Sequence, residues 1–357
     1  MNRPPSQTHD ALLSAISLST LILLLLTNGP GPSATGEQKH RGSLPGTVGE
    51  ANQVVTLAAT ASIAGKVVDQ RNRSLGGARV IVRGRVMATT DDRGAFTLRG
   101  LEMSGRLAVS FSAPGFMETT KIYRITGASR GDLVVLWPRA AFVSMDAGRG
   151  GRLSFPGGTI NFPPRALVDE AGRSLRCKVR VAFSTLDVSD RHQLRSAPGD
   201  FTARTRDERI QQLESFGVFE VFVEGPNGQR ADLAPGFRAG VELLIPESLR
   251  RRAPGVTGLY SFDMGDGRWV ERGTLKRGRG AVSYTTSVSS TLPAWNADDL
   301  LDATCIRIRV LDCDCGPKAL AQSVHVEAAG VDYSGVSDGY TDPGTGEVCC
   351  GSSVARR

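Results

Sequence analysis

The chain has 357 residues, of which 40% are hydrophobic and 22% charged, so it is long enough to form two or three globular domains. Its net charge of +7 comes mainly from scattered arginines without interleaved aromatic residues, which argues against a specific nucleic-acid site. The same charge favours weak attraction to an anionic polysaccharide.

The N-terminal segment reads as an export signal. An apolar run at residues 11–26 is too short to span a bilayer comfortably, and it is followed by Gly, Pro, Ser and Ala. This pattern predicts a cleaved signal peptide at residues 1–34, with an uncleaved anchor as the alternative. Residues 35–60 are predicted to form a flexible linker. We therefore expect a secreted chain whose mature form has no membrane span.

Residues 61–140 show apolar alternation that is interrupted by Gly and Asp pairs, and they lack helical periodicity. Such a pattern is typical of a compact antiparallel β-sandwich. The strands that it predicts lie at residues 62–69, 78–83, 86–90, 95–98, 106–112, 116–122 and 133–136.

The turns and strand ends of this segment resemble the carboxypeptidase regulatory-like domain. The resemblance is carried by a Gly-x-Val-x-Asp strand, a Gly-Ala-x-Val strand and a Thr-x-Asp-x-Gly-x-Phe hairpin. The main matching residues are Gly65, Asp69, Gly77, Ala78, Thr90, Asp92, Gly94 and Phe96. The resemblance implies a transthyretin-like β-sandwich that accompanies enzymes and carries no peptidase chemistry of its own.

Residues 141–300 again predict an all-β domain, because short alternating runs recur between Gly-rich turns. These runs lie at residues 177–183, 218–223, 241–245, 259–262 and 282–286. The predicted fold class of the whole chain is therefore all-β, with tandem antiparallel β-sandwiches of transthyretin-like or immunoglobulin-like type after the signal segment.

This middle region resembles the cartilage intermediate layer protein family and, at its start, the ZU5 domains of receptors and junction proteins. The points of match include Pro156, Pro163, Trp269, Trp295 and Asn296. The resemblance implies a β-sandwich used for interaction. Some ZU5 relatives cut their own backbone at a His-Phe-Ser element, but Ser290 stands where the histidine would be, so we predict no self-cleavage.

Residues 301–357 look like an incomplete repeat of the first sandwich, enriched in cysteine. Export permits disulfides, so cross-links within this segment are favoured over a metal site, and a Cys305–Cys349 bridge is the preferred pair. Connectivity stays open among the candidates Cys305, Cys313, Cys315, Cys349 and Cys350. Cys177 lies in an alternating run, which predicts a buried thiol.

The sequence contains few residues that could form a catalytic site. It has four histidines, no His-Glu-x-x-His motif and no phosphate-binding Gly loop before a helix, and His192 is expected in an exposed loop. Asp298, Asp299 and Asp302 are weak candidates for a bound ion, although turn-forming aspartate is the favoured interpretation of such clusters. We assign no catalytic residue, metal or cofactor, and we expect each Trp to pack in a core.

These observations predict a secreted, non-catalytic structural or binding protein of the extracellular matrix or cell envelope. Its partner would be an extracellular protein or an anionic polysaccharide. Two alternatives stay open: a polysaccharide-binding module, and an accessory or diverged secreted hydrolase. A hydrolase should gather His192 with Asp or Ser residues in a deep cleft, whereas a binding module should not.

Overall fold

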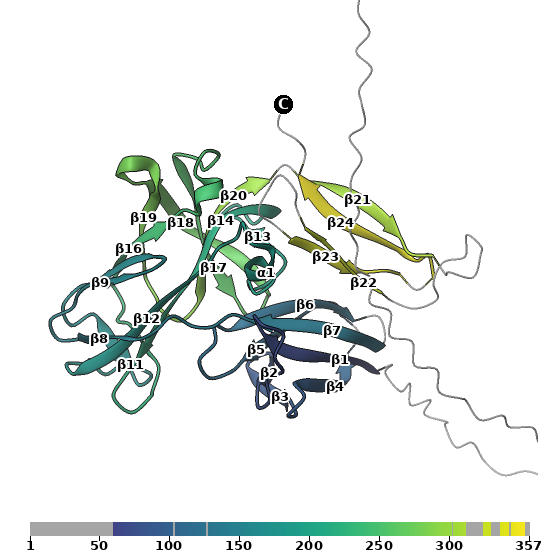
Figure 1. Ribbon diagram of the computed structural model, residues 1–357, viewed down its shortest axis with the longest axis horizontal. Helices are drawn as coiled ribbons and strands as arrows, with labels where there is room; N and C mark the ends of the chain where they lie inside the picture. The colour runs from purple at the N-terminus through teal and green to yellow at the C-terminus, as the bar shows by residue number, and fades with distance from the viewer. Residues whose placement is uncertain are drawn as a thin grey trace, which may run out of the picture. The chain divides into compact units, whose positions relative to one another are not determined.

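The computed structural model describes residues 60–102, 104–125, 128–301, 303–311, 324–329, 336–342 and 344–353. All of them belong to one compact unit. Nearly all regular structure in this part of the chain is β-strand, as the sequence predicts, and Figure 1 shows the strands coloured along the chain. The predicted signal segment lies outside the described residues.

The first module contains seven strands in two sheets, with orders β4-β1-β7 and β3-β2-β5-β6. Each predicted strand is present, and most boundaries agree within about three residues. The strands are β1 (Thr60–Asp69), β2 (Arg79–Val82), β3 (Arg85–Thr89), β4 (Ala95–Glu102), β5 (Ser104–Ser112), β6 (Thr119–Ile125) and β7 (Ala128–Leu136).

The two sheets of this module enclose one apolar core. Ile63 and Phe96 from the first sheet and Val80 and Phe111 from the second are buried in it, because alternate residues of each strand face inward. The Phe96 and Phe111 rings meet edge to face with centroids 5.1 Å apart. All pairings within the module are antiparallel except one, since β7 runs parallel to β1.

The middle region, from β8 to β20, is dominated by an 11-stranded sheet of order β8-β12-β14-β20-β17-β18-β19-β16-β10-β9, with β13 paired to β14 and β18. A second, small sheet pairs β11 with β15. The strands of this region are β8 (Val143–Asp146), β9 (Gly151–Phe155), β10 (Gly158–Phe162), β11 (Leu167–Asp169), β12 (Lys178–Leu186), β13 (Thr202–Arg204), β14 (Ile210–Glu224), β15 (Ala231–Leu233), β16 (Ala239–Leu244), β17 (Val256–Asp263), β18 (Arg268–Arg277), β19 (Ser283–Val288) and β20 (Ala294–Leu301).

One apolar core unites the middle region, and strands from β8 to β20 contribute to it. Trp269 and Trp295 are buried there, which agrees with the packing role expected of them, and Trp137 packs against the same core while partly buried. The helical segments are single turns: α1 (Arg191–Leu194), η1 (Glu247–Leu249) and η2 (Arg279–Ala281). No helix in the described part of the chain has the length and apolar character needed to cross a bilayer.

The last strands form two antiparallel pairs, β21 with β24 and β22 with β23. Their bounds are β21 (Ala303–Arg309), β22 (His325–Ala329), β23 (Val336–Tyr340) and β24 (Glu347–Ser353). In the β21–β24 register, Cys305 lies opposite Gly351 and Cys349 opposite Arg307, so the two cysteines occupy diagonal positions of the ladder. Cys313 and Cys315 lie outside the described residues.

Candidate binding pocket

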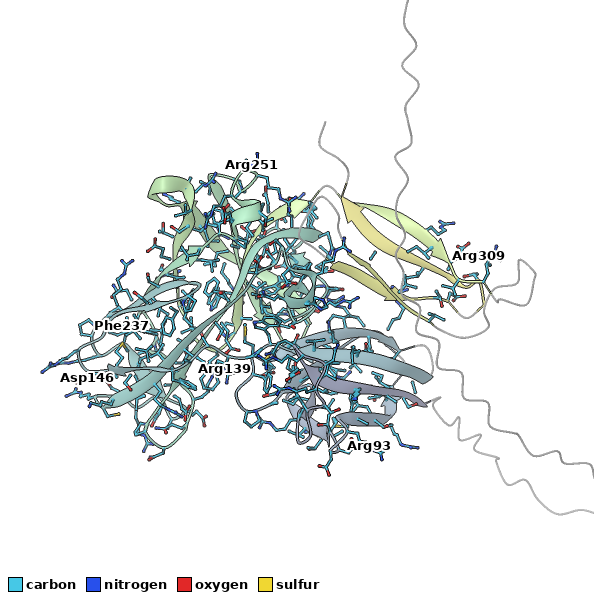
Figure 2. The ribbon with its side chains drawn as sticks, viewed as in Figure 1. Arg93, Arg139, Asp146, Phe237, Arg251 and Arg309 are labelled. Carbon is cyan, nitrogen blue, oxygen red and sulfur yellow. The ribbon has the colours of Figure 1, made fainter. Side chains whose placement is uncertain are left out.

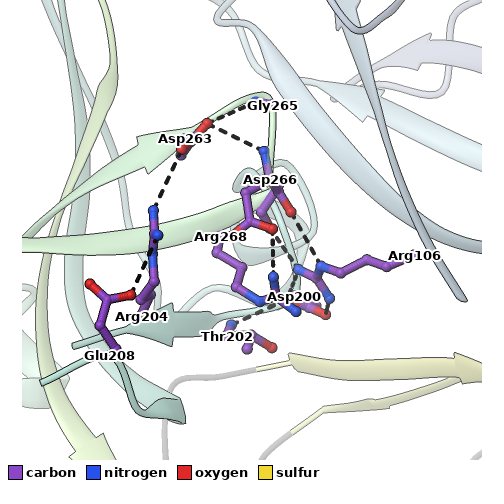
Figure 3. Close-up of polar contacts among 10 residues, drawn as sticks. Arg106, Asp200, Thr202, Arg204, Glu208, Asp263, Gly265, Asp266 and Arg268 are labelled. Carbon is purple, nitrogen blue, oxygen red and sulfur yellow. Dashed lines mark hydrogen bonds and ion pairs between the residues drawn. The ribbon is translucent and has the colours of Figure 1, made fainter.

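Arg106, on β5 of the first module, is bonded to the middle region (Figure 3). Its guanidinium donates to both carboxylate oxygens of Asp200, at 2.7 and 3.0 Å, and to the backbone carbonyls of Asp266 and Gly267. A planar guanidinium with several donors suits this arrangement of oxygens better than a single ammonium group would. Arg106 therefore joins the turn between β17 and β18 to the first module.

A second set of contacts lies along β6. The Gly199 N–H donates to the Thr120 carbonyl at 2.8 Å, and the Thr119 hydroxyl donates to the Ala197 carbonyl. Residues 197–200 thus pack on the first module. Gly267 also packs closely on the first module, since a Cβ at this position would lie 2.5 Å from Ile122 Cδ1.

A pocket of about 430 Å³ opens beside these contacts, a size ordinary for small-ligand sites. The first module contributes Arg79, Ser112 and Glu118 to its wall, and the middle region contributes Phe262 and Met264. The wall thus combines charged groups with an apolar patch.

The most buried charged groups of the pocket surround the ring of Phe222. Arg139, labelled in Figure 2, donates from Nε to Glu220 Oε1 at 2.8 Å, and both side chains are about nine-tenths buried. The guanidinium carbons of Arg139 and Arg230 lie 3.6 and 3.7 Å from the Phe222 centroid. Two groups at these distances cannot share one face, so the ring is covered on both sides by cations.

Two polar atoms of the pocket residues are buried without a hydrogen-bond partner among the described residues: Glu118 Oε1 and Arg230 Nη1. Leaving such an atom unpaired costs about 1–3 kcal/mol. Burial and the carboxylate of Glu220 raise the pKa of Glu118 above its ordinary value, although the nearby arginines act in the opposite direction. Two residues of the pocket wall therefore carry one donor and one acceptor without a partner among the described residues.

Of the residues selected from the sequence, Gly77 alone lines this pocket. Its charged residues were missed, although one signal was present: Glu220 is the sole charged residue in the apolar run of residues 215–223. A charge placed in the middle of a buried strand needs a partner, and here that partner is Arg139.

The residues of the first-module motif hold its strands and turns. A Cβ on Gly65 would lie 2.6 Å from the Asp132 carbonyl, and one on Gly94 would lie 2.4 Å from the Val67 carbonyl. Thr90 Oγ1 accepts from the buried Ala78 N–H. Asp92 is exposed, and the neighbouring Asp91 accepts the N–H groups of the hairpin turn.

Other motif residues also serve the fold. Gly77 has φ of 74°, which only glycine adopts freely, and it lines the pocket. Pro156 lies in the exposed turn between β9 and β10, and Pro163 follows β10. Asn296 is fully buried and accepts a 2.6 Å hydrogen bond from Ser215.

The predicted ion candidates do not converge. Asp298 and Asp299 are consecutive in β20 and so point to opposite faces of the sheet, with Asp298 fully buried and Asp299 partly exposed. Asp302 lies outside the described residues. Within the described ranges, no group of three or more His, Cys, Asp or Glu side chains is placed to hold a metal ion.

Cys177 is exposed, not buried as the alternating pattern predicted. It precedes β12, which begins at Lys178, so the strand periodicity does not extend to it. His192 is exposed on α1 and is not part of the pocket wall, in line with its expected place on the surface.

Comparison with known proteins identifies the first module. The family model of the carboxypeptidase regulatory-like domain matches residues 62–135. Residues 62–135 form a carboxypeptidase regulatory-like domain. The match covers β1 to β7 almost completely. The resemblance of residues 141–300 to the cartilage intermediate layer protein and ZU5 families stays a prediction.

No curated protein matches the chain. Among solved structures, similarity is found to a protein of unknown function from Bacteroides fragilis, with 10% identity, a TM-score of 0.19 and coverage of 68% of this chain and 98% of that one. The Bacillus anthracis TIE protein is 11% identical, with a TM-score of 0.20, and the match covers 82% of this chain but 44% of that one. A major pilin subunit of Bacillus cereus is 10% identical, with a TM-score of 0.19 and coverage of 82% and 84%. The function must therefore be argued from this chain's own residues.

Proposed function

We propose that this chain is an exported, non-catalytic binding protein of the extracellular matrix or cell envelope, and that it holds its ligand in the pocket lined by Arg79, Glu118 and Arg230. The N-terminal apolar run supports export. The observation that carries the binding role is the pair of buried, unpartnered polar atoms of two pocket residues, Glu118 Oε1 and Arg230 Nη1.

The hydrolase alternative has one observation in its favour, because two carboxylates, Glu118 and Glu220, line the same pocket. Paired carboxylates can divide acid and base roles when their surroundings separate their pKa values. However, Glu220 is held by Arg139 in a nearly buried ion pair, which leaves it poorly placed to exchange protons with a substrate. Binding without turnover is the better account.

We also propose the division of the chain that the sequence indicated, with a signal peptide over 1–34, a linker over 35–60, and units over 61–140, 141–300 and 301–357. Hydrogen bonds like those of the first module support a second transthyretin-like unit over residues 301–357. The Val324 N–H donates to Thr341 Oγ1 as the Ala78 N–H does to Thr90 Oγ1. The β21–β24 pair likewise corresponds to the antiparallel β1–β4 pair.

The Cys305–Cys349 bridge stays part of this proposal. Mass mapping of the exported protein without reduction would identify the linked cysteines. A peptide pair that joins Cys305 to Cys349 is the expected product, and a bridge from Cys305 to any other cysteine would contradict it.

The test of the function uses the full chain, secreted from an exporting host and mixed with isolated matrix or envelope material. We expect an N-terminus beyond residue 34, co-sedimentation with the material, and no release of soluble fragments. Release of fragments that stops in Glu118→Gln would show a hydrolase and overturn the proposal. Failure to co-sediment at low salt would also overturn it.

A further inference from the structure

The charges of the pocket restrict the ligand that it can hold. Three arginines, Arg79, Arg139 and Arg230, line it together with two glutamates, which leaves one net positive charge. A ligand with a single negative charge neutralises the net charge of this wall. A doubly charged phosphate group would exceed it and would be repelled by Glu118 and Glu220.

The unpartnered atoms restrict the ligand further. Arg230 Nη1 needs an acceptor, and a carboxylate is the singly charged group whose planar geometry best fits a guanidinium. Glu118 Oε1 accepts a hydrogen bond when the carboxyl is ionised, so the ligand must carry a donor. An ammonium donor would lie among three guanidinium groups, and like charges disfavour that placement. A hydroxyl group avoids the repulsion.

The remaining wall is apolar. Phe262, Met264 and Leu292 line the pocket, and the last two side chains are exposed. Both faces of the Phe222 ring are already covered by arginines, so an aromatic stacking platform is not available there. Aliphatic and ring-edge groups of this kind can pack against the C–H face of a sugar ring, while the hydroxyls of the sugar point toward the charged residues.

We infer that the pocket binds a sugar acid, that is, a uronic acid residue with one carboxylate and several hydroxyls, within an acidic polysaccharide. The sugar carboxylate pairs with Arg79 and Arg230, and a sugar hydroxyl donates to Glu118. This inference rests on the proposed binding function and names the ligand class for the same pocket.

Calorimetric titration of the full secreted chain with trigalacturonic acid, and with its methyl ester, tests this ligand class. The ester keeps the rings and hydroxyls but removes the charge, so we expect it to bind at least about tenfold more weakly than the acid. Arg79→Ala should weaken binding of the acid by a similar factor. Arg93→Ala is the matched control, since Arg93 is another exposed arginine of the same module but does not line the pocket, and it should leave binding unchanged.

Glu118 is tested by two substitutions. Glu118→Met removes the acceptor and should weaken binding, whereas Glu118→Gln keeps an acceptor oxygen and should retain it. Thermal unfolding of each variant verifies that the fold is intact. Equal binding of acid and ester would overturn the inference. The inference would also be overturned if the acid failed to bind while the chain still co-sedimented with envelope material. That result would contradict the ligand class but leave the proposed binding function supported.

Discussion

Asp69 and Asp169 hold the same turn in two different parts of the chain. In each turn, Oδ1 accepts the backbone N–H groups two and four residues further on, and Oδ2 accepts from the arginine four residues on, Arg73 or Arg173. The backbone bonds that follow are also equivalent, since Leu75 and Leu175 each donate to the carbonyl eight residues earlier. A short Asp-x-x-x-Arg-Ser-Leu sequence therefore builds one turn in both the first module and the middle region.

The Asp69 turn should make stability depend on acid pH. Burial alone raises the pKa of Asp69, but hydrogen bonds from Arg73 and Arg71 outweigh it and leave the pKa below its ordinary value. A lowered pKa in the folded state stabilises the fold above the unfolded value of about 3.9, and this contribution is lost as the pH falls through the folded pKa. Asp69→Asn should lower the free energy of unfolding at pH 7 by about 1–3 kcal/mol.

Urea denaturation of wild type and Asp69→Asn at pH 7 and pH 3 measures this effect, and the two curves should converge at the lower pH. Asp92→Asn is the matched control, because Asp92 is exposed and no hydrogen bond to its side chain is found in the described part of the chain. A constant difference at both pH values would show that the turn does not need the charge.

Removing one partner of the Arg139–Glu220 ion pair should strongly destabilise the fold. Glu220 is 6% exposed, so Arg139→Met leaves a buried carboxylate without its counter-ion and should destabilise the fold by about 3–5 kcal/mol. Adding Glu220→Leu removes the stranded charge and should recover most of the loss. The measurement is the urea midpoint of the single and double variants.

The comparison pair for this experiment is Arg209 and Asp207, whose side chains are 62% and 60% exposed. Arg209→Ala should change the free energy of unfolding by less than about 1 kcal/mol, because solvent screens exposed pairs. Similar losses for Arg139→Met and Arg209→Ala would contradict the importance assigned to burial.

Asp298 should change the pH dependence of stability in the opposite direction to Asp69. Its side chain is fully buried, and neither carboxylate oxygen has a well-formed hydrogen bond to another described residue. Burial raises the pKa of Asp298 well above its ordinary value, with Asp299 and Glu214 adding to the effect and Ser215 opposing it. The folded state therefore keeps a proton that the unfolded state has lost.

As the pH rises above the unfolded pKa of about 3.9, wild-type stability should fall by up to about 1.4 kcal/mol per pH unit until the folded pKa is reached. Asp298→Asn removes this dependence, so its advantage over wild type should grow with pH. Chemical denaturation from pH 4 to pH 8 gives the slope. A slope shared by both proteins would assign the pH dependence to other groups.

Gly267 should be intolerant of any side chain because of what it contacts. Gly267 and Gly84 have φ of 68° and 74°, so alanine costs both a similar amount of backbone strain, about 1–2 kcal/mol. A Cβ on Gly84 would meet nothing within 4 Å, whereas one on Gly267 would meet Ile122 and Ala108. Gly267→Ala should therefore cost about 1–3 kcal/mol more than Gly84→Ala.

Differential scanning calorimetry compares these two variants. Because the contact joins β5 and β6 to the turn after β17, Gly267→Ala should also split or broaden the thermal transition as the first module separates from the middle region. Equal shifts in Tm for both variants would show that the packing around Gly267 relaxes without cost.

The strands of the first module were predictable because each lies between turn residues and keeps a period of two, as in β1 and β5. The long sheet of the middle region was less predictable, since the pairing of β14 with β20 joins residues that are far apart in the chain. Periodicity describes one strand and carries no information on which distant strand lies beside it.

The pocket was missed for the same reason. Arg79, Glu118, Arg139 and Arg230 are isolated charges in separate segments, and only the docking of residues 197–200 and Gly267 on the first module brings their segments together. The glycines and aromatic residues that form recognisable motifs mainly hold strands, turns and cores.

The parallel pairing of β1 with β7 has a mechanical consequence. The chain enters the carboxypeptidase regulatory-like domain at the start of β1 and leaves at the end of β7, and these points lie at opposite ends of two adjacent strands. Tension along the chain would pull the strands lengthwise past each other and would load their shared hydrogen bonds together instead of opening them one at a time. A module whose ends are connected in this way resists stretching along the chain.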